Sequence, residues 1–129
     1  MALAFEARIP GTPHGVGLLR REMTELAKDC GMDAEAIADV GLAVTEAATN
    51  AVIHAYAEAE GELRVTAAVQ EGELAIVVGD TGPGLIEGRD SPGLGLGLSI
   101  IASVAERLRI VNRPGGTEIH MAFPCPDAD

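Results

Sequence analysis

The chain has 129 residues, of which 47% are hydrophobic, and its formal net charge is −11 at pH 7. This length and apolar content predict a single domain, residues 1–129, with a buried core. The acidic charge argues against a nucleic-acid partner, because neutralising phosphates requires a basic face. No apolar run approaches the roughly 20 residues of a membrane span. Glu6 and Arg8 interrupt the apolar start of the chain, which argues against a signal peptide.

The two cysteines, Cys30 and Cys125, lie far apart, with no motif around either. Unpaired thiols of this kind are typical of a reducing compartment, so we expect a cytoplasmic protein. Two cysteines and three scattered histidines are too few for a zinc motif. Lys28 is the only lysine, and it falls in a helix-like segment that belongs to no phosphate-binding motif.

Residues 2–9 alternate between apolar and polar side chains, which predicts a half-buried strand. The pattern then predicts a helix over residues 13–30, for which Thr12 is a suitable N-cap. A second, longer helix is expected over residues 34–57, preceded by Asp33 as its cap. Each helix has an apolar stripe at helical spacing, which marks the face that packs on the core.

The second half of the chain predicts two strands across a short turn, a Gly/Pro-rich loop, a helix and a final hairpin. These elements are expected over residues 62–70, 73–79, 79–95, 96–108, 109–112 and 117–123. Helices therefore cluster apart from mainly antiparallel strands. The predicted class is α+β, a two-layer α/β sandwich whose mixed, mostly antiparallel sheet is covered by helices on one face.

Glu46 and Asn50 lie four residues apart in the second predicted helix, so they share one face of it, and His54 continues the row. This row is off the apolar stripe and is compatible with an ordinary solvated face. Asn is mildly unfavourable in a helix interior, because its side chain competes for backbone hydrogen bonds. The helix alone leaves both interpretations open.

Asp80 stands at the end of an apolar strand and opens the stretch Asp-Thr-Gly-Pro-Gly, with Gly82 and Gly84 at alternate positions. Such a stretch is typical of a turn. It is equally typical of a site where a carboxylate accepts hydrogen bonds from a ligand amino group, as in base recognition. The glycines would then let the backbone approach that ligand.

The stretch SPGLGLGLSI places Gly93, Gly95 and Gly97 immediately before or at the start of a helix. A helix N-terminus has free N–H groups and a positive dipole end, which suit a phosphate. The alternative is a lid that binds nothing. The stretch is neither a P-loop nor a dinucleotide-binding fingerprint, since neither glycine pattern is satisfied.

Taken together, the three elements supply the parts of a nucleotide site. Asp80 would bind a base, the glycine-rich stretch would hold phosphates, and Asn50 could give Mg²⁺ an oxygen ligand. One protein oxygen is enough for such a metal, because Mg²⁺ takes its other ligands from phosphates and water.

In this order and at this spacing, the motifs resemble the ATP-binding domain of gyrase, the ninety-kilodalton heat-shock chaperone, sensor histidine kinases and mismatch-repair ATPases. This is the Bergerat, or histidine-kinase-like ATPase, fold. Within it, residues 3–124 are most similar to the small bacterial anti-sigma-factor serine/threonine kinases. The resemblance implies a kinase that phosphorylates an anti-anti-sigma-type antagonist and sequesters a sigma factor or a similar client. It also implies a homodimer.

Residue roles follow from the same resemblance. It implies that Glu46 is the general base and that Asn50 ligates the Mg²⁺ bound to the ATP phosphates. It implies that Asp80 binds the adenine amino group and that Thr117, after Gly116, lies near adenine and Asp80. The other expected nucleotide contacts are Gly82, Gly84, Arg89, Gly93, Leu94, Gly95, Leu96 and Gly97.

Some assignments keep an alternative. Arg89 is a candidate phosphate contact or a surface residue of the lid. Arg20 and Arg21, with the first strand and helix, are a candidate partner surface or a solvated face. For the whole chain, three other functions stay open. They are an ATP-binding regulatory module without phosphotransfer, the catalytic half of a split histidine kinase, and an interaction domain that binds no nucleotide.

Overall fold

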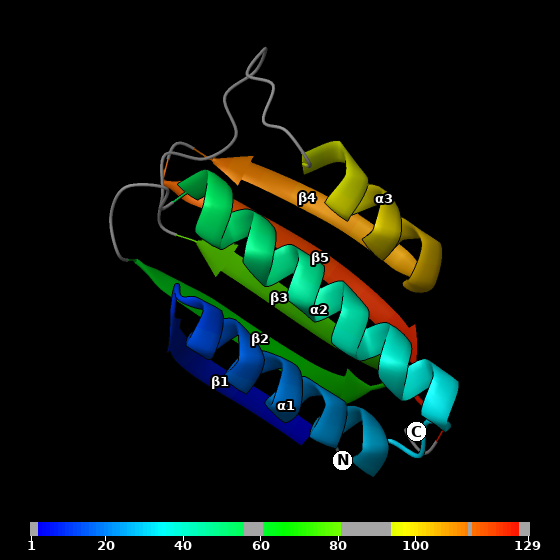
Figure 1. Cartoon of the computed structure of the whole chain (residues 1–129). Helices are drawn as coiled ribbons and strands as arrows, with labels where there is room; N and C mark the ends of the chain where they lie inside the picture. Colours follow the sequence, from blue (N-terminus) through cyan, green and yellow to red (C-terminus); the bar gives the residue numbers. More distant parts are fainter. Residues whose placement is uncertain (1–2, 56–60, 81–93, 114, 127–129) are drawn as a thin grey trace.

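The computed structural model consists of a five-stranded sheet with three helices on one of its faces (Figure 1). It describes residues 3–55, 61–80, 94–113 and 115–126. The elements, in chain order, are β1 (Leu3–Pro10), α1 (Pro13–Asp29), α2 (Ala34–Ala55), β2 (Glu62–Gln70), β3 (Glu73–Asp80), α3 (Leu94–Val104), β4 (Arg107–Arg113) and β5 (Gly116–Pro124). The predicted α+β two-layer architecture is confirmed.

The strand order across the sheet is β1-β2-β3-β5-β4, and every pairing within the described strands is antiparallel. β2 and β3 are joined through Glu71 and Gly72, whose φ angles of 54° and 76° are typical of a tight hairpin turn. Further along, β5 lies beside β3 although α3 and β4 separate the two in sequence. Because they run antiparallel, the end of β3 adjoins the start of β5.

The core lies between the sheet and the helices, where every second strand residue meets the apolar stripes. α1 contacts β1, α2 contacts β3 and β5, and α3 contacts β4. Val40 and Val44, one turn apart on α2, are fully buried. The other large, fully buried apolar side chains are Leu19, Met23, Leu63, Val65, Leu74, Ile76, Val78 and Ile101. Burying each stabilises the fold by about 1.5–3 kcal/mol before conformational entropy is counted.

The predicted helix caps are present. The Thr12 side chain accepts a hydrogen bond from the Gly15 N–H at 3.1 Å, and the Asp33 side chain accepts one from the Ala36 N–H at 2.8 Å. Each cap satisfies one of the N–H groups that a helix leaves unpaired at its start. Gly31, with φ of 82°, follows the end of α1, where this left-handed conformation favours glycine.

The third helix differs from its predicted range. It begins two residues earlier than expected, at Leu94, so Gly95 lies inside it rather than in the preceding loop. It also ends at Val104, and Leu108, the last residue of the predicted helix, lies in β4 opposite Met121. The strand ladder with β5 prevails over helix propensity at this point, because tertiary pairing supplies interactions that local sequence patterns do not include.

Two segments far apart in sequence meet at the end of α1. Cys125, just after β5, is buried, and its thiol donates to the carbonyl oxygen of buried Cys30 at 3.4 Å. The Cys125 N–H also donates to the Gly72 carbonyl oxygen at 2.8 Å. These contacts fix the end of β5 against the β2–β3 turn and α1.

Among the described residues, no helix combines the length and the apolar character that a membrane span requires.

Two glycines in α1 provide a matched test of the contact between α1 and β1. A Cβ on Gly15 would lie 1.9 Å from the Pro10 carbonyl oxygen, whereas a Cβ on Gly17 would meet nothing within 4 Å. We therefore expect Gly15→Ala to lower the free energy of unfolding by about 1–3 kcal/mol through overpacking. Gly17→Ala should raise it by about 0.5–1 kcal/mol through helix propensity. Urea denaturation measures both, and equal shifts would contradict the close α1–β1 contact.

Candidate functional site

Asp80 and Thr117 lie side by side at the edge of the core. Asp80 is the last residue of β3 and shares its helix-facing side with Ile76 and Val78. Thr117 is near the start of β5, and its backbone N–H donates to Asp80 Oδ1 at 3.4 Å. The two residues are only 7% and 6% exposed. A buried carboxylate requires hydrogen-bond donors around it, so this position suits a donor on a ligand. The structure brings the two predicted residues together.

Asn112, which belongs to none of the predicted motifs, extends this pair. Asn112 in β4 is the register partner of Thr117 in β5, and Thr117 Oγ1 donates to Asn112 Oδ1 at 3.2 Å. The sequence did contain a usable signal, because a hairpin around the predicted turn of residues 113–116 pairs position 112 with position 117. Asn112, Thr117 and Asp80 thus form one row across β4, β5 and β3.

Asn50 lies beneath α3. It is only 7% exposed, and a Cβ built on Gly97 would lie 2.7 Å from Asn50 Nδ2 and 2.9 Å from Oδ1. Only glycine therefore leaves room for the amide in its present position. The interpretation of this helix row as a solvated face is wrong for Asn50, because α3 covers it, and a helix-to-helix contact of this kind has no signature in local sequence.

The amide of Asn50 tests whether a nucleotide with Mg²⁺ suits this site. Its Nδ2 atom is buried and has no hydrogen-bond partner among the residues that the structure describes. Such an unsatisfied group costs about 1–3 kcal/mol. A phosphate oxygen would accept from Nδ2, and the amide oxygen is a ligand type that Mg²⁺ accepts. The N-terminus of α3, which begins at Leu94, adds a positive dipole end. The residues present fit both groups.

Glu46 lies one helical turn before Asn50 on α2, and its side chain is half-buried. A carboxylate in this position can accept a proton from a substrate hydroxyl. Gly82, Gly84, Arg89 and Gly93 lie outside the described residues. Leu94, Gly95 and Leu96 form the first turn of α3.

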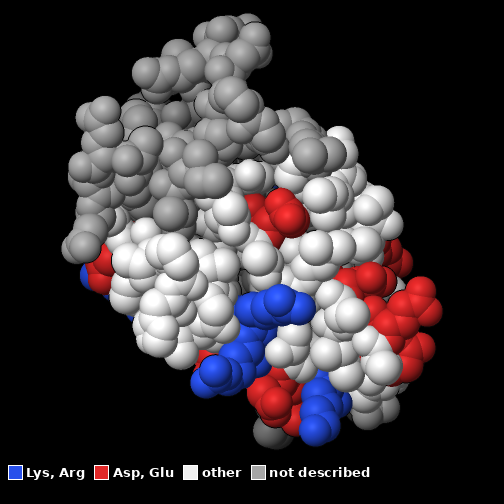
Figure 2. All heavy atoms as spheres, in the orientation of Figure 1, with Lys and Arg blue, Asp and Glu red and all other residues white. Residues whose placement is uncertain are grey.

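The candidate partner surface lies elsewhere on the helix face. Figure 2 shows basic side chains gathered over α1, with acidic side chains around them. α1 carries Arg20, Arg21 and Lys28. A Cβ on Gly41 of α2 would lie 3.2 Å from Arg20 Nε, so Arg20 packs across the point where the two helices meet. Arg20 and Arg21 are both exposed, which is consistent with either a partner surface or a solvated face.

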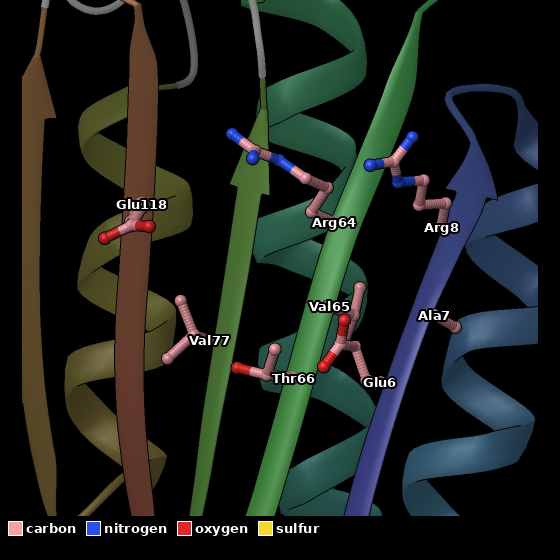
Figure 3. Close-up of a pocket in the computed structure, with 8 residues that line it drawn as sticks. All are labelled: Glu6, Ala7, Arg8, Arg64, Val65, Thr66, Val77 and Glu118. Atoms are coloured by element: carbon pink, nitrogen blue, oxygen red, sulfur yellow. The ribbon is translucent and has the colours of Figure 1, made fainter.

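The opposite face of the sheet carries a separate hollow of about 460 Å³. Arg8, Arg64 and Gly79 stand opposite one another in the strand register, and the Arg64 side chain extends from β2 over β3 (Figure 3). The hollow is lined by Glu6, Ala7, Arg8, Arg64, Val65, Thr66, Val77 and Glu118. Asp80 and Asn50 face the helix side of the sheet, so this hollow is separate from their site.

Comparison with known proteins shows the family to which the chain belongs. Residues 9–123 match the profile of a family described as the histidine kinase-like ATPase domain. The chain is 30% identical over 129 residues to the serine-protein kinase RsbW of Bacillus subtilis, covering 88% of this chain and 81% of that protein. It is 35% identical over 101 residues to the anti-sigma F factor of Pasteuria penetrans, covering 67% of each. Matches to several further RsbW proteins span 49–50% of their length.

A solved structure shares the fold. It contains the RsbU and RsbW domains of a Mycobacterium tuberculosis protein and superposes with a TM-score of 0.75 at 25% sequence identity. The match covers 95% of this chain and 32% of that one. The fold of nearly the whole chain is therefore one that a known protein also adopts.

Gly97 tests the position of the Asn50 amide. In Gly97→Ala the new Cβ displaces the end of the Asn50 side chain. Because a side-chain end can move, we expect the free energy of unfolding to change by less than about 1 kcal/mol. ATP affinity in the presence of Mg²⁺ should fall by about tenfold or more, as the amide no longer meets the ligand. Isothermal titration calorimetry measures the affinity. Gly17→Ala is the control, and an unchanged Gly97→Ala affinity would remove Asn50 from the site.

Proposed function

Because the chain belongs to the family of histidine kinase-like ATPase domains, we propose that it is a cytoplasmic protein serine/threonine kinase and partner-switching regulator. It binds ATP with Mg²⁺, phosphorylates a small anti-anti-sigma-type antagonist, and sequesters a sigma factor or a similar client. The buried Asn50 amide beneath Gly97, with Glu46 one turn away, is the observation that carries the proposal. The names of two relatives, a serine-protein kinase and an anti-sigma F factor, support it.

In this proposal the nucleotide spans the two layers of the fold. Asp80 and Thr117, which lie where the end of β3 adjoins the start of β5, receive the adenine. Asn50 and the start of α3, with Gly95 and Gly97, receive the phosphates. Gly82, Gly84, Arg89 and Gly93 are proposed to take part as well. Lys28 does not take part, because it lies in the last turn of α1, next to the start of α2, whereas Asn50 lies towards the end of α2 (Figure 1).

Phosphoryl transfer requires mainly positioning and charge stabilisation. The Asn50 oxygen would hold Mg²⁺, which would neutralise charge on the phosphates. The Glu46 carboxylate orients the attacking serine or threonine hydroxyl and takes its proton as the new phosphorus–oxygen bond forms and ADP leaves. Since Glu46 and Asn50 share one helix face, they keep a constant spacing between base and phosphates.

The partner surface is proposed on β1 and α1. β1 is an edge strand of the sheet, and α1 beside it presents Arg20 and Arg21 in a chain whose net charge is −11. A basic patch on an acidic protein orients an approaching acidic partner and limits non-specific association. We place the antagonist, the client and the second copy of a homodimer on this part of the molecule.

Glu46→Gln separates catalysis from binding. It keeps the shape of the side chain and removes its basicity, so transfer to the antagonist should fall by about 10²–10⁴-fold. ATP affinity should stay close to that of the unmodified chain. Single-turnover assays with γ-labelled ATP and an anti-anti-sigma-type antagonist from the same genome measure transfer. Glu35→Gln, an acidic residue in the first turn of α2, is the control.

The product of the same assay decides between functions. Phosphoserine or phosphothreonine on the antagonist supports the kinase. Acid-labile phosphohistidine on a partner protein would instead indicate the catalytic half of a split histidine kinase. ATP binding with no transfer by the unmodified chain would indicate a regulatory module, and equal transfer by Glu46→Gln would remove Glu46 from its role.

A further inference from the structure

The hydrogen bond between Thr117 and Asn112 has a direction that affects the site. A threonine hydroxyl carries one proton and two lone pairs, and an amide oxygen can only accept. Thr117 Oγ1 donates that proton to Asn112 Oδ1 at 3.2 Å. Held in this way, the hydroxyl has only lone pairs to offer any other group that approaches it.

Asp80 presents lone pairs at the same place. Its carboxylate, when ionised, only accepts hydrogen bonds, and one oxygen already receives the Thr117 N–H at 3.4 Å. Every second residue of β3 points towards the helices, and this set ends with Val78 and Asp80. On β5, Ile119 pairs with Val78, and Thr117 lies two residues before Ile119, so its side chain is on the same face. Asp80 and Thr117 are therefore neighbours on the same face of the sheet. Together they form an edge of hydrogen-bond acceptors.

We propose that Asn112 is a positioning residue that sets the specificity of the site for a purine with an exocyclic amino group. The inference rests on the proposed nucleotide-binding function and deepens it. An amino group at the ring position that faces Asp80 and Thr117 donates two protons, so it matches the acceptors of these two residues. A purine with a carbonyl group there presents lone pairs to lone pairs. Asn112 prevents the Thr117 hydroxyl from turning to donate to that carbonyl.

A purely structural role for this bond has a different consequence. A cross-strand polar pair in a hairpin contributes about 0.2–1 kcal/mol to the stability of the sheet. If that were its only role, loss of Asn112 would lower the stability of the fold and change the affinity for both kinds of purine by the same factor. Asn112 is exposed at the edge strand, so its substitution should leave the fold intact. The ratio of affinities for two purines therefore separates the roles.

The experiment measures the dissociation constants of ATP and inosine triphosphate, with Mg²⁺, by isothermal titration calorimetry. We expect the unmodified chain to prefer ATP. Asn112→Ala should reduce this preference about three- to tenfold, which corresponds to one hydrogen bond. Asn112→Val, which suits an edge strand, should do the same and serves as a second apolar variant. Asn112→Asp should retain the preference, because a carboxylate still accepts the Thr117 proton.

A double-mutant cycle with Thr117→Val completes the test. Without the hydroxyl, Asn112 has nothing to orient, so adding Asn112→Ala to Thr117→Val should leave the purine preference unchanged. An effect of Asn112→Ala that persists in this background overturns the inference, as does an unchanged preference in both apolar single variants. If the unmodified chain binds no ATP, the proposed function fails as well. If the unmodified chain prefers ATP, and the Asn112 variants show the same ratio of ATP to inosine triphosphate affinity, only the role of Asn112 fails.

Discussion

The site depends on the close approach of α3 to α2 at Gly97. A helix that covers Asn50 takes its amide out of water, and the missing side chain of Gly97 keeps the amide in place. The Nδ2 atom then has no partner in the described part of the chain, at a cost of about 1–3 kcal/mol to the fold. Local instability of this kind is typical of binding sites, where a ligand supplies the missing partner.

The second half of the site depends on strand order. Inserting β5 between β3 and β4 brings the end of β3 against the start of β5, so Asp80, Thr117 and Asn112 form a continuous polar row. In the proposed function, the helices would supply the phosphate end of a nucleotide site and the sheet its base end. A nucleotide would therefore contact both layers, and its binding energy would contribute to holding them together.

The two faces of the sheet have different roles. One face packs under the helices and presents Asp80 at its edge. The other carries Arg8, Arg64 and Glu118 in one cross-strand row (Figure 3). Antiparallel sheets commonly keep one solvated face, and the alternation of buried and exposed residues along β2 follows that rule.

The sequence by itself determined the elements, their order, the caps at Thr12 and Asp33, and the α+β class, because hydrophobic periodicity and capping are local. The resemblance of its motifs to a known family implied in addition that Asp80 and Thr117 would lie close together, as they do. Only the tertiary structure decided that α3 ends before Leu108, that Gly97 covers Asn50, and that Asn112 joins the polar row of Asp80 and Thr117. These three features arise from contacts between residues distant in sequence, where packing and strand pairing prevail over local preference.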